Sequence, residues 1–179
     1  MSDNGGAFGG PVWTAVYIVW GVALAAVLAL LFVVPIGSIG WLVWVGWGAF
    51  AFSAVLGWVP ILAFHRRGGV TKGRTYVHTT QLVTSGLYAI VRHPQYLAGD
   101  FLAVAVMCIT QHWATLLAGG IAILTNRLSM IKADRGLVSK FGEDYRAYMA
   151  RVPRANVPVG LWRWVGRNRA SQSSASSRR

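Results

Sequence analysis

The stretch from Gly86 to Tyr96 holds an arginine, a histidine and a proline in succession, and it is the part of the chain best suited to chemistry. Pro94 biases His93 away from helical geometry and is itself suited to the first position of a helix. Arg92 and His93 are therefore expected at a helix entrance, where free N–H groups and the helix dipole favour an anion. A guanidinium beside a titratable imidazole can bind a carboxylate or a phosphate there. The alternative is a loop of membrane-interface anchors.

Asp100 is the one acidic residue in an otherwise apolar run. It lies four residues after Tyr96 and seven after His93, so the three share a face if the helix begins promptly at Pro94. An ionisable residue at membrane depth is a candidate functional residue. Alternatively, Asp100 pairs with Arg127 or faces water near a helix end.

Asn126, Met130 and Asp134 follow at helical spacing where the last apolar run becomes polar. They are expected on one face, either as a polar rim over Arg92 and His93 or as an ordinary helix end.

A second helical pattern, from 138 to 152, brings Phe141, Tyr145, Tyr148 and Val152 to one face. This stripe favours packing over a cofactor site. No P-loop glycines, histidines at metal spacing or hydrolytic triad are evident in the sequence.

The elements that must position these residues are apolar. Of the 179 residues, 55 % are hydrophobic and 12 % are charged, which is about half the charged share of soluble domains. Four apolar runs are evident, at 13–34, 41–64, 96–110 and 113–131. The first two are long enough to cross a bilayer, whereas the third is short for a full span. We therefore predict an all-α integral membrane protein with about four transmembrane or membrane-embedded helices and a cytosolic C-terminal amphipathic helix.

The polar parts of the chain set its organisation. Residues 1–64 are expected to form a two-helix scaffold, 65–166 the core with the helical hairpin, and 167–179 a disordered basic tail. The single cysteine, Cys108, excludes an intrachain disulfide and a cysteine-rich zinc site.

Charge predicts the orientation in the membrane. All 17 lysines and arginines lie between Arg66 and Arg179, so the 65–92 connector and both termini are expected in the cytoplasm of a bacterial or archaeal cell. The turns at 35–40 and 111–112 would then share the opposite side. Anionic membrane lipid accounts for the net charge of +12, and no nucleic-acid partner is expected.

Taken in order, several short motifs resemble the isoprenylcysteine carboxyl methyltransferase and phospholipid methyltransferase superfamily of integral membrane enzymes. They cover about residues 76–156 and are Gly86-x-Tyr88, Arg92-His93-Pro94-x-Tyr96, Asp134, Phe141-Gly142-x-x-Tyr145-x-x-Tyr148 and Val152-Pro153-Arg154. Where the family usually has a Glu-Glu pair, this chain has Ala133 and Asp134.

The resemblance implies S-adenosylmethionine as methyl donor, bound from the cytosolic side without a metal. Carried over by position, the cofactor residues are Tyr88, Arg92, His93, Pro94, Tyr96, Asn126, Asp134 and Tyr145. Arg92 suits the cofactor carboxylate and Asp134 its ammonium. The catalytic candidates are Arg92 together with His93, Tyr96 and Asp100, which would orient the nucleophile or take its proton.

We therefore expect an S-adenosylmethionine-dependent methyltransferase acting on a membrane-soluble, lipid-like or prenylated substrate. The alternatives are a nicotinamide-dependent membrane reductase of related architecture and a non-catalytic lipid-binding member of the family. The sequence leaves open whether the acceptor is a carboxylate, an amine or a thiol, and it predicts no oligomeric state.

Overall fold

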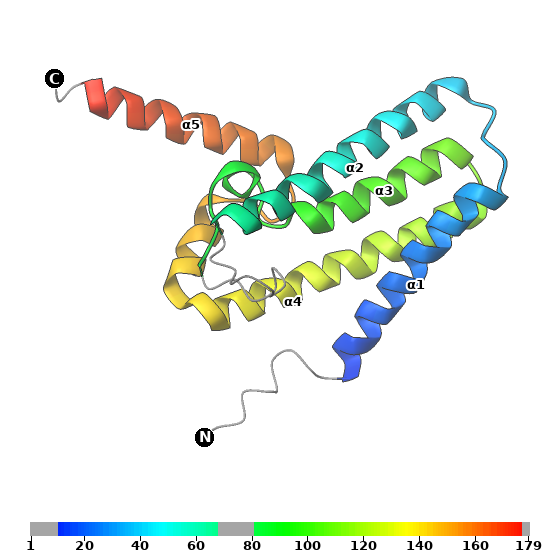
Figure 1. Cartoon of the computed structure of the whole chain (residues 1–179), viewed down its shortest axis with the longest axis horizontal. Helices are drawn as coiled ribbons and strands as arrows, with labels where there is room; N and C mark the ends of the chain where they lie inside the picture. The colour runs from blue at the N-terminus through cyan, green and yellow to red at the C-terminus, as the bar shows by residue number, and fades with distance from the viewer. Residues whose placement is uncertain (1–10, 68–80, 177–179) are drawn as a thin grey trace. The chain divides into compact units, whose positions relative to one another are not determined.

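The computed structural model describes residues 11–67 and 81–176, and within these ranges the secondary structure is helical, with no strand (Figure 1). This confirms the all-α prediction. The elements are α1 (Pro11–Val33), α2 (Gly40–Arg67), the short 3₁₀ helix η3 (Gly86–Ala89), α3 (Pro94–Thr110), α4 (Trp113–Arg151) and α5 (Val157–Ser176). Residues 68–80 of the predicted connector lie outside the described residues.

Three helices are long and apolar enough to cross a membrane, namely α1 over Thr14–Val33, α2 over Gly40–Leu62, and α4. Large apolar side chains such as Phe32, Trp44 and Trp58 are exposed along α1 and α2, as expected for helices solvated by lipid. The protein is therefore an integral membrane protein. The third predicted membrane helix, α3, has only 17 residues and falls below the usual length of a span.

The chain forms two compact units, and the predicted domain boundaries at 64 and 166 stay predictions. The first unit comprises residues up to Trp58 together with Gln95–Lys140, and the second comprises Val59–Pro94 and the chain from Phe141 onward. The first unit contains most of the apolar helices, and the second contains η3 and α5.

In the first unit, small residues let α2, α3 and α4 pack closely (Figure 1). On α2, Ser53 donates a hydrogen bond to the carbonyl of Ala98 at 2.7 Å. A Cβ atom on Gly46 would lie only 2.8 Å from the carbonyl oxygen of Ala105, so glycine is required at this contact. The core of this unit is therefore built on close approach of backbones.

Two turns meet at one end of the first unit. The side chain of Gln111 donates to the carbonyl of Ile39 at 3.0 Å and accepts from its N–H at 3.1 Å, while Gly37 N–H donates to the carbonyl of Ile109 at 2.8 Å. The prediction that the turns at 35–40 and 111–112 lie on the same side is confirmed. Neither turn contains a lysine or an arginine.

The polar C-terminal part differs from the prediction in two respects. The helix predicted over 138–152 is the continuation of α4, interrupted where Gly142 takes φ 57° and ψ −130°. Lys132, Ala133 and Arg135 are good helix formers, so the change of composition near residue 132 does not end the helix. The prediction of disorder from residue 167 is wrong as far as Ser176, because α5 extends to that residue. Residues 177–179 lie outside the described part.

Candidate functional site

The Arg92–His93 segment belongs to the second unit and lies between η3 and α3. Gly86, with φ 66°, begins the tight turn of η3, and Pro94 is the first residue of α3, as predicted. The segment is well packed, since Arg92 is 9 % exposed and His93 is 5 % exposed. The two side chains are therefore set in a defined place and do not lie on an open loop.

The backbone of this segment is hydrogen bonded to the chain that follows α4. The N–H of Arg92 donates to the carbonyl of Pro153 at 3.1 Å, and the N–H of His93 donates to the carbonyl of Arg154 at 3.2 Å. These residues are some sixty positions apart in the sequence. The Arg-His-Pro and Val-Pro-Arg motifs are thus two halves of one local structure.

Three further contacts hold η3 and the residues after it. The hydroxyl of Tyr148 donates to the carbonyl of Tyr88 at 2.6 Å, and the ring of Tyr145 packs edge-on against that of Tyr148. Arg167 Nη2 donates to the carbonyl of Ala89 at 2.7 Å. Gly160 faces the carbonyl of Ile90 so closely that a Cβ atom at position 160 would collide with it.

These contacts and the burial of Tyr145, Tyr148 and Val152 show that this part of the aromatic stripe packs within the second unit, while contact of Tyr145 with a cofactor stays a prediction. Arg167 is the residue that the sequence analysis missed, because it was placed in the tail. The apolar residues Leu161, Trp162 and Val165 just before it were a signal that the structured chain continues to this point.

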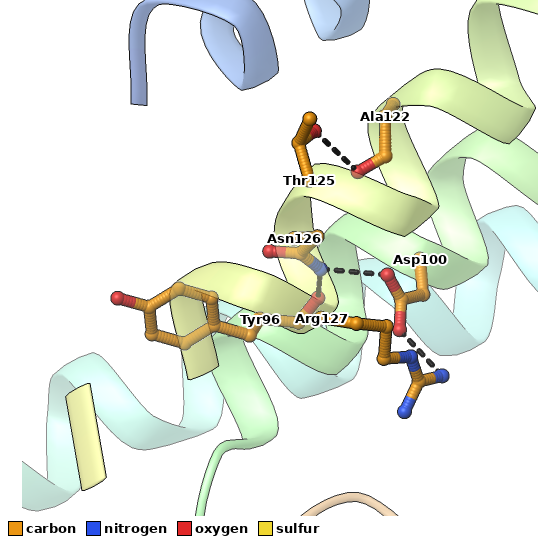
Figure 2. Close-up of polar contacts among 6 residues, drawn as sticks. All are labelled: Tyr96, Asp100, Ala122, Thr125, Asn126 and Arg127. Atoms are coloured by element: carbon orange, nitrogen blue, oxygen red, sulfur yellow. Dashed lines mark hydrogen bonds and ion pairs between the residues drawn. The ribbon is translucent and has the colours of Figure 1, made fainter. Parts of the chain in front are cut away.

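A separate polar cluster lies in the first unit, between α3 and α4 (Figure 2). Asn126 Nδ2 donates to Asp100 Oδ1 and to the carbonyl of Tyr96, both at 2.6 Å. Arg127 Nη2 lies 2.7 Å from Asp100 Oδ2. The pairing of Asp100 with Arg127, one of the interpretations left open by the sequence, is confirmed.

The geometry of the cluster gives Asp100 a linking role. Figure 2 shows the carboxylate of Asp100 between Asn126 and Arg127, with the ring of Tyr96 pointing away from it. One carboxylate oxygen faces Asn126 and the other faces Arg127. Asp100 thus ties α3 to α4 through both oxygens, while a role in proton transfer stays a prediction.

A second feature of the polar cluster is the carboxamide oxygen of Asn126. Because its amide nitrogen faces two acceptors, its carboxamide oxygen must point elsewhere. That oxygen is buried and accepts no hydrogen bond from the residues that the structure describes. A buried acceptor of this kind is costly unless a donor from water or a ligand reaches it.

Asn126, Met130 and Asp134 are all buried, which confirms that they share one face of α4. The structure thus brings together Tyr96, Asp100 and Asn126 in the first unit, with Asp134 two turns further along. In the second unit Tyr148 contacts both Tyr88 and Tyr145, and Arg92 and His93 follow Tyr88 closely in the sequence. Their joint participation in cofactor binding stays a prediction. Within the described ranges, no group of three or more His, Cys, Asp or Glu side chains is suitably placed for a metal ion.

Comparison with known families identifies the chain. Residues 41–140 match the family model described as phospholipid methyltransferase, and this segment is more than half of the 179 residues. The chain belongs to the phospholipid methyltransferase family. This confirms the resemblance to the integral membrane methyltransferases. Neither the curated proteins nor the solved structures contain a match to the chain.

The part that matches the phospholipid methyltransferase family runs from α2 into the last third of α4. It contains Arg92, His93, Asp100, Asn126 and Asp134. The residues that hold the Arg92–His93 segment in place, among them Tyr148, Pro153 and Arg167, follow the matched part. The family match thus includes the candidate cofactor and catalytic residues named here, whereas the residues that hold the Arg92–His93 segment lie after the match.

Proposed function

We propose that the protein transfers a methyl group from S-adenosylmethionine to a lipid-like acceptor in the membrane. Membership of the phospholipid methyltransferase family supports methyl transfer and a lipid acceptor. The observation that carries the assignment of the site is the pair of backbone hydrogen bonds from Arg92 and His93 to Pro153 and Arg154. They fix the backbone that carries a guanidinium and an imidazole just before α3, and a fixed backbone favours binding of a charged cofactor there.

The chemistry of the available side chains fits this cofactor, whose methionine part carries a carboxylate and an ammonium group. Arg92 is a buried permanent cation suited to the carboxylate. Asp134 is a buried acid suited to the ammonium, and we assign it this role from the family resemblance. When bound, the cofactor supplies a methyl group on a positively charged sulfur.

Arg92, His93 and Asp100 are the residues that we expect to position the cofactor and the acceptor and to supply charge. A guanidinium held in a poorly hydrated place interacts more strongly with an anion than one in water. His93 is the group that we assign to accept a proton from an amine or thiol acceptor, while a carboxylate acceptor needs no base. We assign Asp100 a positioning role, because both of its oxygens are engaged within the α3–α4 cluster.

The orientation that we propose places both termini and the Arg92–His93 segment on the cytosolic side. The absence of lysine and arginine before Arg66, and from the two turns that meet at one end of the first unit, supports this orientation. The cofactor then arrives from the cytosol and the acceptor from the lipid phase.

Calorimetry on the purified full chain in detergent tests the cofactor assignment. We expect S-adenosylmethionine to bind to the wild type and Arg92→Ala to weaken binding by about tenfold or more, as for loss of a charge-assisted hydrogen bond. Arg146→Ala is the matched control, because Arg146 is exposed and pairs only with Glu143 in the described structure. No binding to the wild type at millimolar cofactor would refute the proposal, and binding of NADPH instead would point to a reductase.

A further inference from the structure

A cavity of about 320 Å³ lies within the second unit, apart from the residues assigned above to cofactor and catalysis. The loop before η3, the end of α4 and the middle of α5 form its walls. The residues that matter for its chemistry are Thr84, Ser85, Arg151, Trp164, Arg167 and Asn168. It is large enough for a phosphate group with the atoms attached to it.

The cavity is cationic. Arg167 donates to the backbone carbonyls of Arg151 at 2.9 Å and of Ala89 at 2.7 Å, and Arg151 Nε donates to the carbonyl of Ala147 at 3.2 Å. These acceptors are neutral, so they fix the guanidinium groups without compensating their charge. No acidic residue is among those that line the cavity. Each guanidinium has five N–H donors and therefore retains further donors for an anion.

The nearest acids in sequence do not neutralise these arginines. Glu143 pairs with Arg146 at 2.6 Å, and the only other acid in the described part of the second unit is Asp144, which is exposed. A cavity with two fixed guanidinium groups and no carboxylate suits phosphate better than an uncharged ligand, because arginine binds phosphate oxygens in a bidentate manner.

The surface of α5 indicates where such a phosphate comes from. Leu161 and Trp162 are 46 % and 77 % exposed, and the exposed Arg163 and Arg169 follow them on the same helix. A helix with exposed apolar and aromatic side chains beside arginines is typical of the membrane interface, where anionic lipid attracts basic residues. In an integral membrane protein, the phosphate most accessible to this cavity is that of a phospholipid.

We propose that this cavity binds the phosphate of an anionic phospholipid, with α5 lying in the headgroup region of the membrane. This cavity shares no lining residue with those assigned above to cofactor and catalysis, and the proposal does not rest on the proposed function. Because Arg167 also holds Ala89, three residues before Arg92, a bound lipid would stabilise the segment that carries Arg92 and His93.

The test uses the full chain in detergent with short-chain phosphatidylglycerol as the anionic probe and phosphatidylcholine as the zwitterionic one. We expect phosphatidylglycerol to bind to the wild type and to raise its Tm, with phosphatidylcholine doing neither. Arg151→Gln should weaken phosphatidylglycerol binding about tenfold, and Arg151→Gln with Arg167→Gln should weaken it further. Arg146→Gln, a change of the same kind on the exposed face of α4, should leave binding within about twofold.

Arg151→Gln alone keeps the carbonyl that Arg167 binds, so it tests the cavity even if the double variant does not fold. Equal affinity of wild type and Arg151→Gln for phosphatidylglycerol would overturn the proposal. So would equal binding of the two lipids, or displacement of the lipid by inorganic phosphate at equal concentration, which would indicate a site for free phosphate. Retained lipid binding in a chain that binds no S-adenosylmethionine would leave this proposal standing while the proposed function fails.

Discussion

The backbone N–H of His93 donates a hydrogen bond to the carbonyl of Arg154, 61 residues later in the sequence, at 3.2 Å. Together with the neighbouring bond from Arg92 to Pro153, this contact makes the start of α3 depend on the chain after α4. The C-terminal part of the protein is therefore a structural requirement for the candidate site, although it follows the part that matches the family.

Tyr148→Phe should weaken cofactor binding without removing an aromatic ring from the core. The change deletes the hydroxyl that donates to Tyr88 and leaves a buried carbonyl without that donor. We expect a loss of about 1–3 kcal/mol in the free energy of unfolding and a higher Kd for S-adenosylmethionine. Chemical denaturation measures the free energy of unfolding, and calorimetry measures the Kd. Tyr17→Phe, on α1, is the control, because the centroid of its ring lies 5.1 Å from Lys132 Nζ and the ring keeps that contact without the hydroxyl. Equal effects of both changes would contradict the role assigned to Tyr148.

Gly160→Ala should destabilise the second unit, because the added Cβ atom would collide with the carbonyl of Ile90. Gly166→Ala, in the same helix, is a matched control, since a Cβ atom there would meet nothing within 4 Å. The control should gain up to about 1 kcal/mol from the higher helix propensity of alanine. Thermal unfolding of both variants checks the prediction, which fails if Gly160→Ala is as stable as Gly166→Ala.

Asp100 and Asn126 should be energetically coupled. A double-mutant cycle with Asp100→Ala and Asn126→Ala should give a coupling free energy of about 0.6–2 kcal/mol, the range found for hydrogen bonds between membrane helices. Thr110→Ala combined with Asn126→Ala should be additive, because Thr110 bonds to Val106 and Thr115 at the far end of α3, ten residues from Asp100. Additivity of the first pair would contradict the linking role of Asp100.

Asp134→Ala should lower the affinity for S-adenosylmethionine, and Asp134→Glu should largely restore it, because the carboxylate is what we assign to the cofactor ammonium. Ala133→Glu with Asp134→Glu recreates the pair of acids usual in the family. We expect methyl transfer by the wild type already, and by this variant at a similar rate. Activity confined to the variant would instead indicate that the natural chain is a non-catalytic member.

Much of the fold could be predicted from the sequence because its signals are local. Long charge-free runs predict α1 and α2, and Pro94 predicts the start of α3. That the turns at 35–40 and 111–112 lie at the same end was also predictable, since lysines and arginines are missing from both.

The rest depends on contacts that leave little trace in the sequence. A backbone hydrogen bond such as that between His93 and Arg154 requires no particular side chain, so no motif predicts it. The break at Gly142 was not predictable from the helical spacing around it, because the pattern of Phe141, Tyr145 and Tyr148 fits an unbroken helix. Arg167 was missed because a polar, serine-rich end is also the composition of a disordered tail.

The most direct test of the central claim is transfer of labelled methyl from S-adenosylmethionine into lipid by the reconstituted full chain. We predict that label enters the lipid fraction with the wild type and Arg146→Ala, and falls at least about tenfold with Arg92→Ala. Absence of label from the lipid fraction with the wild type, in vesicles made from a total extract of the host membrane, would contradict the account.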